Sequence, residues 1–589
     1  MCGICGEMRF NGTQTGDIRS NIMLDAISSR GPDNTGSYTD KNIFLGHKRL
    51  SVIDVSSNSH QPMEDNNLII VFNGVIFNYK KLRDILSIEG YEFFSDGDTE
   101  VILKCYMHYG EDMLNHLDGV FSFVIYDRNS KEFFCARDRL GIKPFYYTYA
   151  KDAFAFSSNT AAFIDDKKDF SINKKSLHHQ FTLHSVVPAP DTILSNIFKL
   201  EPGSFARVYS DGKISKTKYY SFNHIKLNIK NNDREIIEET DRLLLKAIEK
   251  RFYTADVDVG VLLSGGLDSS LIVAMASKHN LSDINTFSIG FPTIGNEEGN
   301  EFYYSDKVSK QFKTNHHKYN ISQDELFGSL DDVVKAMPEP MFSQDSAAFY
   351  LLAKKVSLKQ KVVLSGQGAD ELFGGYFWYK KMDQTRGSSV EKFTQHYFDR
   401  EHDDYCKMIN KSFANIDYSL PLIEKLYDDQ RNDISFLDKT LRIDLSTLII
   451  DDPVKRVDSM TMSHGLETRV PFLDRDLFEF VLSIPSLSKL KNDGKYYLKK
   501  IAEKYLHDEL IYRDKFYFPV PPLKIIQGQF YTYIKSILLS NSCKRRGLYN
   551  SEYIRKILSN PNSHFTKLNG NTLWHLGLLE RWFQLNDDS

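Results

Sequence analysis

The stretch from Gly260 to Ser270 reads GVLLSGGLDSS, a short apolar run that passes into a loop of serines and glycines. An apolar helical pattern follows from Leu271 to Ala274. Such a loop lets backbone N–H groups approach a phosphate, which the N-terminus of the following helix also attracts. The loop lacks the Gly-Lys-Ser/Thr ending of a Walker A sequence, so transfer of a γ-phosphate is not expected. The sequence predicts a phosphate-binding strand–loop–helix unit, with a ligand-free glycine turn as the alternative.

Two further apolar strands are predicted downstream, at Asn285–Phe291 and Lys361–Leu364, and the second again ends in a glycine-rich loop. Strands that alternate with helices and end in glycine and polar residues indicate a parallel doubly wound sheet with its ligand at that edge. Asp268 and Asp370 should then lie on neighbouring loops. Two carboxylates there suit Mg²⁺ shared with the phosphates. The alternative for Asp370 is a solvated start of a helix.

The chain begins Met1-Cys2-Gly3-Ile4-Cys5-Gly6. Removal of Met1 would give Cys2 a free α-amine, whose pKa of roughly 7.7 to 8.0 lets it take the proton of a thiol with a pKa of about 8.5. Cys2 and Cys5 could instead form a redox or zinc pair. Zinc needs a second ligand pair, however, and a redox pair is expected inside a thioredoxin-like unit. The other cysteines are scattered singly, at positions 105, 135, 406 and 543.

Polar residues follow three predicted elements of the first hundred residues. Arg49 lies in the run HKRLSVID at a strand end, Asn73 and Gly74 lie between two apolar runs as a predicted turn, and Asp98 precedes a helical pattern. Arg49 offers a guanidinium to an α-carboxylate, and Asp98 offers a carboxylate to an α-ammonium. Asn73 and the Gly74 backbone offer donors to a tetrahedral oxyanion. Together they predict a free amino acid site with the machinery of amide hydrolysis.

About the first two hundred residues resemble the N-terminal-nucleophile glutaminase half of glutamine-dependent asparagine synthetases, through the run ARDRLGIKPFYY at 136–147. The resemblance implies that Cys2 attacks the side-chain amide of glutamine, forms a thioester and releases ammonia, while Asn73 and Gly74 hold the oxyanion. It implies a glutamine-binding set of Arg49, Leu50, Val52, Ile53, Asn73, Val75 and Asp98. Val75 stands where the family usually has Glu, so a carboxylate beside the glutamine is lost.

The second half resembles the synthetase domain of the same family, and SGGLDS resembles the loop of ATP pyrophosphatases, which form acyl-adenylates. Residues 457–474, Gly494-Lys495 and the run from Arg513 to Pro521 carry this likeness. It implies that Lys495 stabilises charge on the reacting acyl phosphate and that Asp268 and Asp370 bind Mg²⁺. The implied ATP site comprises Leu262, Leu263, Ser264, Gly265, Gly266, Asp268, Ser269, Ile289, Ser365 and Gly366.

The implied fold combines α/β and α+β parts. Residues 1–208 are expected as a four-layer αββα N-terminal-nucleophile (Ntn) hydrolase domain of class II glutamine amidotransferase type. Residues 236–589 are expected as a doubly wound parallel-sheet ATP pyrophosphatase domain with extra helices. The polar stretch 209–235 is the predicted linker, because an apolar helical pattern starts at Ile236. The charged and aromatic segment 380–433 suggests helices but no function.

Length and composition are compatible with such an enzyme. The chain has 589 residues, 41% hydrophobic and 26% charged, and a net charge of −4, which is too balanced for a nucleic-acid-binding surface. No apolar run reaches the ~18 residues of a membrane span, and no signal peptide is recognisable. Six scattered cysteines fit a reducing cytoplasm. The sequence is compatible with a homodimer.

The expected function is that of a ligase requiring ATP and Mg²⁺, in which glutamine-derived ammonia amidates a carboxylate activated as its AMP ester. Aspartate is the family's default acceptor. Gln367 replaces the family's usual Glu and removes a carboxylate where ammonia addition would want a base. Three other features resemble instead the branch that amidates N-acetylglutaminylglutamine: Val75, the run HSVVPAP at 184–190 and the run YFPVP at 517–521. The intact Ser264–Ser270 loop and Lys495 speak against a plain glutaminase. Cys2 speaks against an ammonia-free β-lactam synthetase and against a binding protein.

Overall fold

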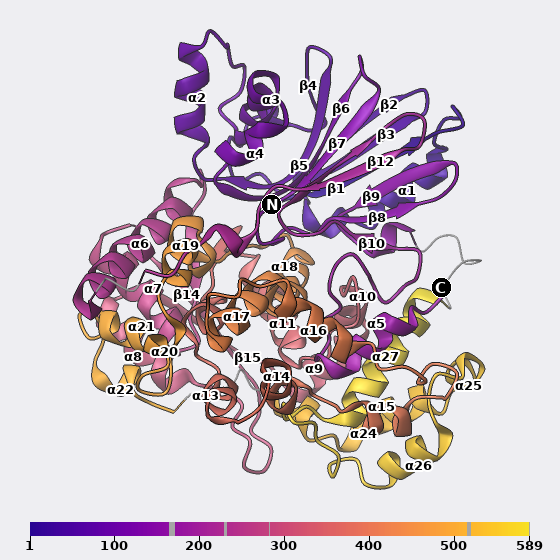
Figure 1. The fold of residues 1–589 in the computed structure, drawn as a ribbon, viewed down its shortest axis with the longest axis vertical. Helices are drawn as coiled ribbons and strands as arrows, with labels where there is room; N and C mark the ends of the chain where they lie inside the picture. Colours follow the sequence, from indigo (N-terminus) through magenta and orange to yellow (C-terminus); the bar gives the residue numbers. More distant parts are fainter. Residues whose placement is uncertain (164–170, 229–231, 282, 515–519, 588–589) are drawn as a thin grey trace.

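The computed structural model describes residues 1–163, 171–228, 232–281, 283–514 and 520–587. Two antiparallel sheets form the upper part in Figure 1, and a parallel sheet surrounded by helices forms the lower part. Residues 515–519, which include most of the YFPVP run, lie outside the described residues. Within the described part of the chain, no helix combines the length and apolar character that crossing a membrane requires.

The upper part has two six-stranded sheets packed face to face. The first has the order β10 (Phe198–Lys199), β8 (Tyr146–Tyr149), β9 (Ala153–Ser157), β1 (Gly3–Arg9), β3 (Ile43–Arg49), β2 (Asn34–Asp40). The second has the order β12 (Ile214–Lys218), β11 (Ser204–Val208), β7 (Glu132–Arg137), β6 (Gly119–Asp127), β5 (Leu68–Ile76), β4 (Met63–Asp65). An apolar core that includes Ile4, Leu45 and Val71 lies between the sheets.

Helices cover the outer faces of both sheets and complete the four αββα layers. They are α1 (Asp17–Asp25), α2 (Tyr79–Ile88), α3 (Asp98–Tyr109) and α4 (Met113–His116). Helix α5 (Lys174–Thr182) lies away from these sheets, among the helices of the lower part in Figure 1. Phe72 and Phe121 of the second sheet pack against α2 and α3, whereas Cys5 and Phe44 of the first sheet face α1. The predicted fold of the N-terminal half is therefore confirmed.

Two local predictions differ from the structure. Asn73 and Gly74 form no turn but lie within β5, which pairs continuously with β6. A Cβ on Gly74 would lie 2.2 Å from the carbonyl oxygen of Val120, so the glycine permits a close approach of two strands. Residues 209–213, predicted to begin the linker, form the turn of the β11–β12 hairpin. A polar hairpin turn has the same composition as a linker, which explains the difference.

The lower part is built on a five-stranded parallel sheet. Its order is β15 (Asn315–Asn320), β14 (Asn285–Gly290), β13 (Val259–Leu262), β16 (Val362–Leu364), β17 (Glu467–Arg469). Val261 packs towards α6 and α7 on one face, and Leu262 packs towards α11 on the other. Because helices cover both faces, the sheet is doubly wound as predicted.

The helices of this part begin with α6 (Asp233–Tyr253), α7 (Leu267–Lys278), α8 (Phe302–Phe312), α9 (Gln323–Gly328), α10 (Leu330–Lys335), α11 (Asp345–Val356), α12 (Ala369–Phe373) and α13 (Phe377–Gln384). They continue with α14 (Ser389–Tyr397), α15 (His402–Met408), α16 (Ser419–Asp428), α17 (Phe436–Ile443), α18 (Lys455–Met462), α19 (Arg475–Leu482) and α20 (Ser486–Lys489). The last are α21 (Tyr496–Ala502), α22 (Asp508–Ile511), α23 (Pro521–Lys524), α24 (Gly528–Leu538), α25 (Asn541–Arg546), α26 (Ser551–Ser559) and α27 (Thr572–Asp587).

Buried ion pairs join the two parts. Asp458 of α18 accepts from Arg30 Nη2 at 2.9 Å and from Lys143 Nζ at 2.8 Å. Burial alone would raise the pKa of Asp458, but the two cations outweigh that effect and lower the pKa to about 2. Since this value is below the ordinary 3.8, the pairs stabilise the fold above about pH 4, and that stabilisation is lost as the pH falls through about 2.

We expect Asp458→Asn to destabilise the protein strongly at pH 7, because Arg30 and Lys143 would stay buried without their counter-charge. Removal of one partner from a buried pair costs roughly 3–5 kcal/mol. Thermal unfolding should therefore show a clearly lower midpoint for the variant, and the difference from wild type should shrink towards pH 2.

Glu238→Gln is the matched control, because it removes the carboxylate of an exposed ion pair with Arg234 on α6. Its melting temperature should equal that of wild type. Equal melting temperatures for Asp458→Asn and Glu238→Gln at pH 7 would show that the interface pairs do not hold the two parts together.

Candidate active sites

The N-terminal residues are buried at the junction of the two parts, where Figure 1 marks the N-terminus. The Cys2 backbone N–H donates to Asn73 Oδ1 at 3.1 Å, and Arg30 Nε donates to the Cys2 carbonyl at 3.1 Å. The Cys2 thiol lies 3.9 Å from the carbonyl oxygen of Leu50. Burial raises the pKa of this thiol, although the N-terminal ammonium and Arg49 oppose the rise. The thiol therefore needs an assisting base to react near neutral pH.

A small pocket surrounds Cys2. Its volume of about 30 Å³ holds one or two water molecules but no amino acid, and Met1 forms part of its wall. It is lined by Met1, Cys2, Arg49, Leu50, Val52, Ile53, Ser59, Gln61, Phe72, Gly74, Asp98, Thr99, Glu467 and Arg469. Loss of Met1 would enlarge the pocket and place the amine of Cys2 beside its own thiol, as expected from the sequence.

The side chain of Asn73, the predicted oxyanion donor, lies beside the Cys2 backbone. It is fully buried, its Oδ1 is held by the Cys2 backbone, and its Nδ2 has no hydrogen-bond partner among the described residues. An unpaired buried donor is costly unless a ligand satisfies it. Asn73 is not among the residues that line the pocket, and its contact with the Cys2 backbone is what places it beside the predicted nucleophile. Val75, one residue beyond Gly74, is not among the residues lining the pocket and packs in the apolar core instead.

Asp98 and Arg49 both face this pocket. Asp98 accepts the Ile76 backbone N–H at 3.0 Å, and burial raises its pKa to about 6, so the carboxylate is charged at neutral pH. Arg49 donates to the carbonyls of Ser56 and Asp54, which fixes the loop above the pocket. The pair thus provides one negative and one positive group at the same pocket, as a free amino acid requires.

Sequence reasoning missed Glu467 and Arg469 as parts of this pocket. Both lie on β17, the edge strand of the parallel sheet, and Glu467 forms buried ion pairs with the Met1 ammonium and with Arg469. Burial would raise the pKa of Glu467, but these cations lower it to about 2. The two residues are separated from Cys2 by most of the chain, so no spacing signal links them to it. The second half of the chain therefore closes the first site.

A larger cleft, with a volume of about 1050 Å³, lies at the carboxyl edge of the parallel sheet. Most of the residues predicted to bind ATP line this cleft: Leu262, Leu263, Ser264, Gly266, Asp268, Ser269, Ile289, Ser365 and Gly366. Gly265 is not among the lining residues; its carbonyl accepts from Arg513 Nη2 at 3.1 Å, and Arg513 pairs with Glu301. Arg513 and Glu301 line the same cleft and hold the loop from beside it. Gln367 also faces the cleft.

Lys495 forms ion pairs with Asp268 and Asp370, the two carboxylates predicted to bind Mg²⁺. Its Nζ lies 2.7 Å from Asp268 Oδ2 and 2.8 Å from Asp370 Oδ1, so the first turns of α7 and α12 converge with the residue before α21. Burial would lower the pKa of Lys495, but the two carboxylates raise it, so the ammonium stays charged. Asn492, Asp493 and Lys495 all have positive φ values, between 52° and 61°. Such backbone strain at non-glycine residues is typical of functional sites.

The donor set of this cleft fits Mg²⁺. Asp268 and Asp370 provide two carboxylates of partial exposure, and Mg²⁺ in phosphate sites is usually held by one or two carboxylates together with phosphate and water oxygens. The neighbouring glycine-rich loop begins α7, whose N-terminus attracts phosphate. The cleft can thus bind a nucleotide with its metal and neutralise charge that develops near Lys495.

Comparison with known proteins gives each half of the chain a family match. Residues 1–220 match the model of the glutamine amidotransferase domain, and residues 239–584 match the model of the asparagine synthase family. The chain is 31% identical to asparagine synthetase [glutamine-hydrolyzing] 1 of Bacillus subtilis, covering 100% of this chain and 97% of the relative. It is 30% identical to asparagine synthetase [glutamine-hydrolyzing] 3 of the same organism, covering 88% of this chain and 87% of the relative.

We expect Cys2 to react with iodoacetamide at least about tenfold faster in protein whose chain starts at Cys2 than in protein that retains Met1, because the amine and the enlarged pocket activate the thiol. The two forms can be prepared by cleaving a tag directly before Cys2 or before Met1. Peptide mass spectrometry at pH 7.5 gives the rate at each cysteine.

Cys406 is the internal control, because this half-buried thiol lies far from the pocket and should react equally in both forms. Equal rates at Cys2 in the two forms would contradict the assignment of the α-amine as the base.

Proposed function

We propose, because this chain belongs to the family of glutamine-hydrolysing asparagine synthetases, that it transfers ammonia from glutamine to a carboxylate activated by ATP. The observation that carries the proposal is the presence of two complementary sites in one chain. One presents a buried thiol with an unpaired Asn73 donor, and the other presents Lys495 between Asp268 and Asp370. Each half-reaction thereby has its own chemistry.

In the first half-reaction, the α-amine of Cys2 takes the thiol proton, and the thiolate attacks the side-chain carbonyl carbon of glutamine. Asn73 Nδ2 donates to the oxyanion, for which it has no competing partner among the described residues. Asp98 binds the α-ammonium and Arg49 the α-carboxylate of glutamine. Ammonia leaves, and water then releases glutamate from the thioester.

In the second half-reaction, the acceptor carboxylate attacks the α-phosphate of ATP, and pyrophosphate leaves. Bound Mg²⁺ would be held by Asp268 and Asp370 and would supply charge neutralisation to the phosphates. The Ser264–Ser270 loop positions the pyrophosphate, and Lys495 stabilises the charge that develops on the acyl phosphate. Ammonia then displaces AMP and forms the amide.

Aspartate is the proposed acceptor, in keeping with the names of the relatives. Gln367 lines the cleft in place of the family's usual Glu and cannot accept a proton from the attacking ammonia. Another group, such as the phosphate of the acyl-adenylate, must therefore take that proton. All six cysteines are free thiols, which supports a place in the reducing cytoplasm.

The direct test supplies ATP, Mg²⁺ and glutamine with a panel of acceptors. With aspartate we expect asparagine, AMP, pyrophosphate and glutamate. Primary formation of ADP and orthophosphate would contradict the adenylation step. Pyrophosphate release with N-acetylglutaminylglutamine but not with aspartate would contradict the acceptor and leave the chemistry intact.

Two variants should separate the sites. Cys2→Ala should abolish glutamine-dependent synthesis, while ammonium salts still support asparagine formation, because the cleft is unchanged. Asp268→Asn should lower synthesis from either nitrogen source by about 100-fold or more, because it weakens metal and phosphate positioning.

Product analysis by chromatography of amino acids and nucleotides distinguishes these outcomes. Glutaminase activity should persist in Asp268→Asn, because Cys2 and its pocket are untouched. Glutamine-dependent synthesis by Cys2→Ala would disprove the nucleophile.

A further inference from the structure

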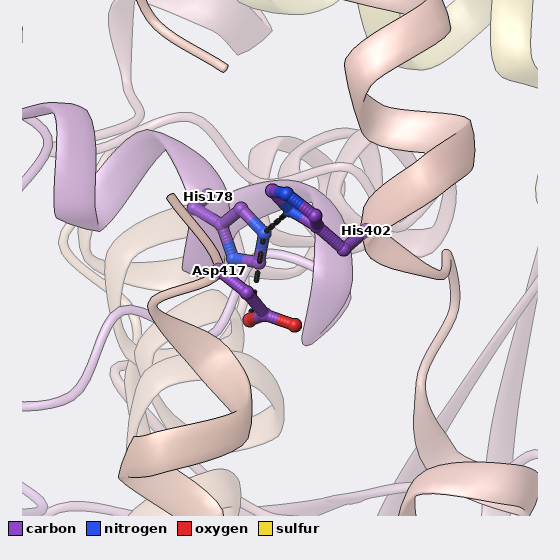
Figure 2. Close-up of side chains that lie close together, drawn as sticks. All are labelled: His178, His402 and Asp417. Carbon is purple, nitrogen blue, oxygen red and sulfur yellow. Dashed lines mark hydrogen bonds and ion pairs between the residues drawn. The ribbon is translucent and has the colours of Figure 1, made fainter. Parts of the chain in front are cut away.

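A cluster of metal-ligand side chains lies outside both catalytic sites, where α5 meets α15 and α16. Figure 2 shows His178, His402 and Asp417 pointing towards one another from three separate segments. His178 Nε2 lies 3.0 Å from His402 Nδ1 and 3.7 Å from Asp417 Oδ1. One ligand atom from each residue lies within 4.8 Å of the other two. Two imidazole nitrogens and a carboxylate oxygen are thus gathered at one point.

Neighbouring groups hold these side chains in place. His178 Nδ1 lies 2.8 Å from Ser419 Oγ, so a hydrogen bond from Nδ1 to Ser419 leaves the lone pair of Nε2 directed at the cluster. Asp417 Oδ1 accepts the backbone N–H groups of Ser419 and Leu420 at 2.9 and 3.0 Å. Ligating histidines in metal sites commonly donate their second nitrogen to such an oxygen. Hydrogen bonds from neighbouring groups therefore hold the side chains of His178 and Asp417 in place.

The distances between the ligand atoms fit tetrahedral coordination of one ion. Ligand atoms that lie roughly 2.0–2.1 Å from one zinc ion are separated by roughly 3.4 Å, close to the distances between these side chains. The His178 side chain is 1% exposed, whereas that of Asp417 is 28% exposed. The cluster is therefore buried on one side and open on the other, which leaves a fourth position for water.

We propose that His178, His402 and Asp417 form a binding site for a divalent transition-metal ion, with Zn²⁺ as the best match. Two neutral imidazoles and one carboxylate are ligands that zinc accepts in protein sites with an open position. The site is independent of the proposed catalytic chemistry. Its ligands come from α5, in the N-terminal half, and from the helical segment of the second half, so a bound ion would fasten that segment to α5.

A second histidine cluster is less suited to a metal. His184, Asp399 and His575 also lie close together, but both oxygens of Asp399 are engaged, by His184 at 3.0 Å and by the Leu568 backbone N–H at 3.0 Å. The ring of His575 is stacked on Phe342. A carboxylate and an imidazole bound in this way have little freedom to approach an ion. This cluster serves as the internal comparison.

The test titrates ZnCl₂ alone into the tag-free full-length protein after removal of metals with a chelator. Competition with a chromophoric chelator gives stoichiometry and affinity, and Co²⁺ provides visible bands that report tetrahedral coordination. We expect one equivalent of Zn²⁺ to bind to wild type. His402→Ala should lower the affinity by about 100-fold or more, and Asp417→Asn by about tenfold.

Control variants keep the proposal falsifiable. His116→Ala removes an exposed histidine elsewhere, and His184→Ala removes one member of the comparison cluster. Both should bind one equivalent with wild-type affinity. Circular dichroism must show that His402→Ala or Asp417→Asn is folded, and both positions are partly exposed, which favours this.

Three results would overturn the proposal. The first is the absence of stoichiometric binding by wild type. The second is unchanged affinity in folded His402→Ala and Asp417→Asn. The third is loss of binding in His184→Ala with retention in His402→Ala, because the ion would then have other ligands.

Discussion

The buried junction between the two halves of the chain is the constraint on which the rest of the structure depends. Its most buried ion pairs place the cations on the N-terminal half and the carboxylates on the second half. Arg30 and Lys143 meet Asp458, and Lys199 meets Glu339 and Asp451. Isolated, either half would expose buried charges without partners, and the Cys2 pocket would lose Glu467 and Arg469 from its lining. The thiol pocket is closed by β17, whose parallel neighbour β16 leads into the loop that lines the nucleotide cleft.

The sequence predicted the structure correctly where one short segment determines both the local fold and the chemistry of its residues. The Gly260–Ser270 segment predicted a strand, a loop and a helix, and the structure has all three. Asp268, Asp370 and Lys495 were nominated separately, and the structure brings the two carboxylates onto one ammonium group. Parallel strands explain this success, because their carboxyl ends meet at one edge.

The remaining features depend on contacts between distant segments, which local patterns do not encode. Glu467 could not be linked to Met1 from spacing, and Asn73-Gly74 has the composition of a turn although it lies inside a strand. The helical segment around α14–α16 gave no functional signal in the sequence. In the structure, its contacts with α5 include the His178–His402 pair. The ligands His178, His402 and Asp417 are too far apart in sequence to form a recognisable metal motif.

In the proposed function the two sites act as one enzyme, so ammonia released at Cys2 should be used in the nucleotide cleft before it mixes with bulk ammonium. The most direct measurement follows synthesis from glutamine labelled with ¹⁵N in its side-chain amide, in an excess of unlabelled ammonium and at saturating aspartate and ATP. If the sites are coupled, the asparagine formed through glutamine hydrolysis carries the label well above the fraction present in bulk ammonium. Label diluted to the bulk value, with glutamate formed independently of asparagine, would contradict the account.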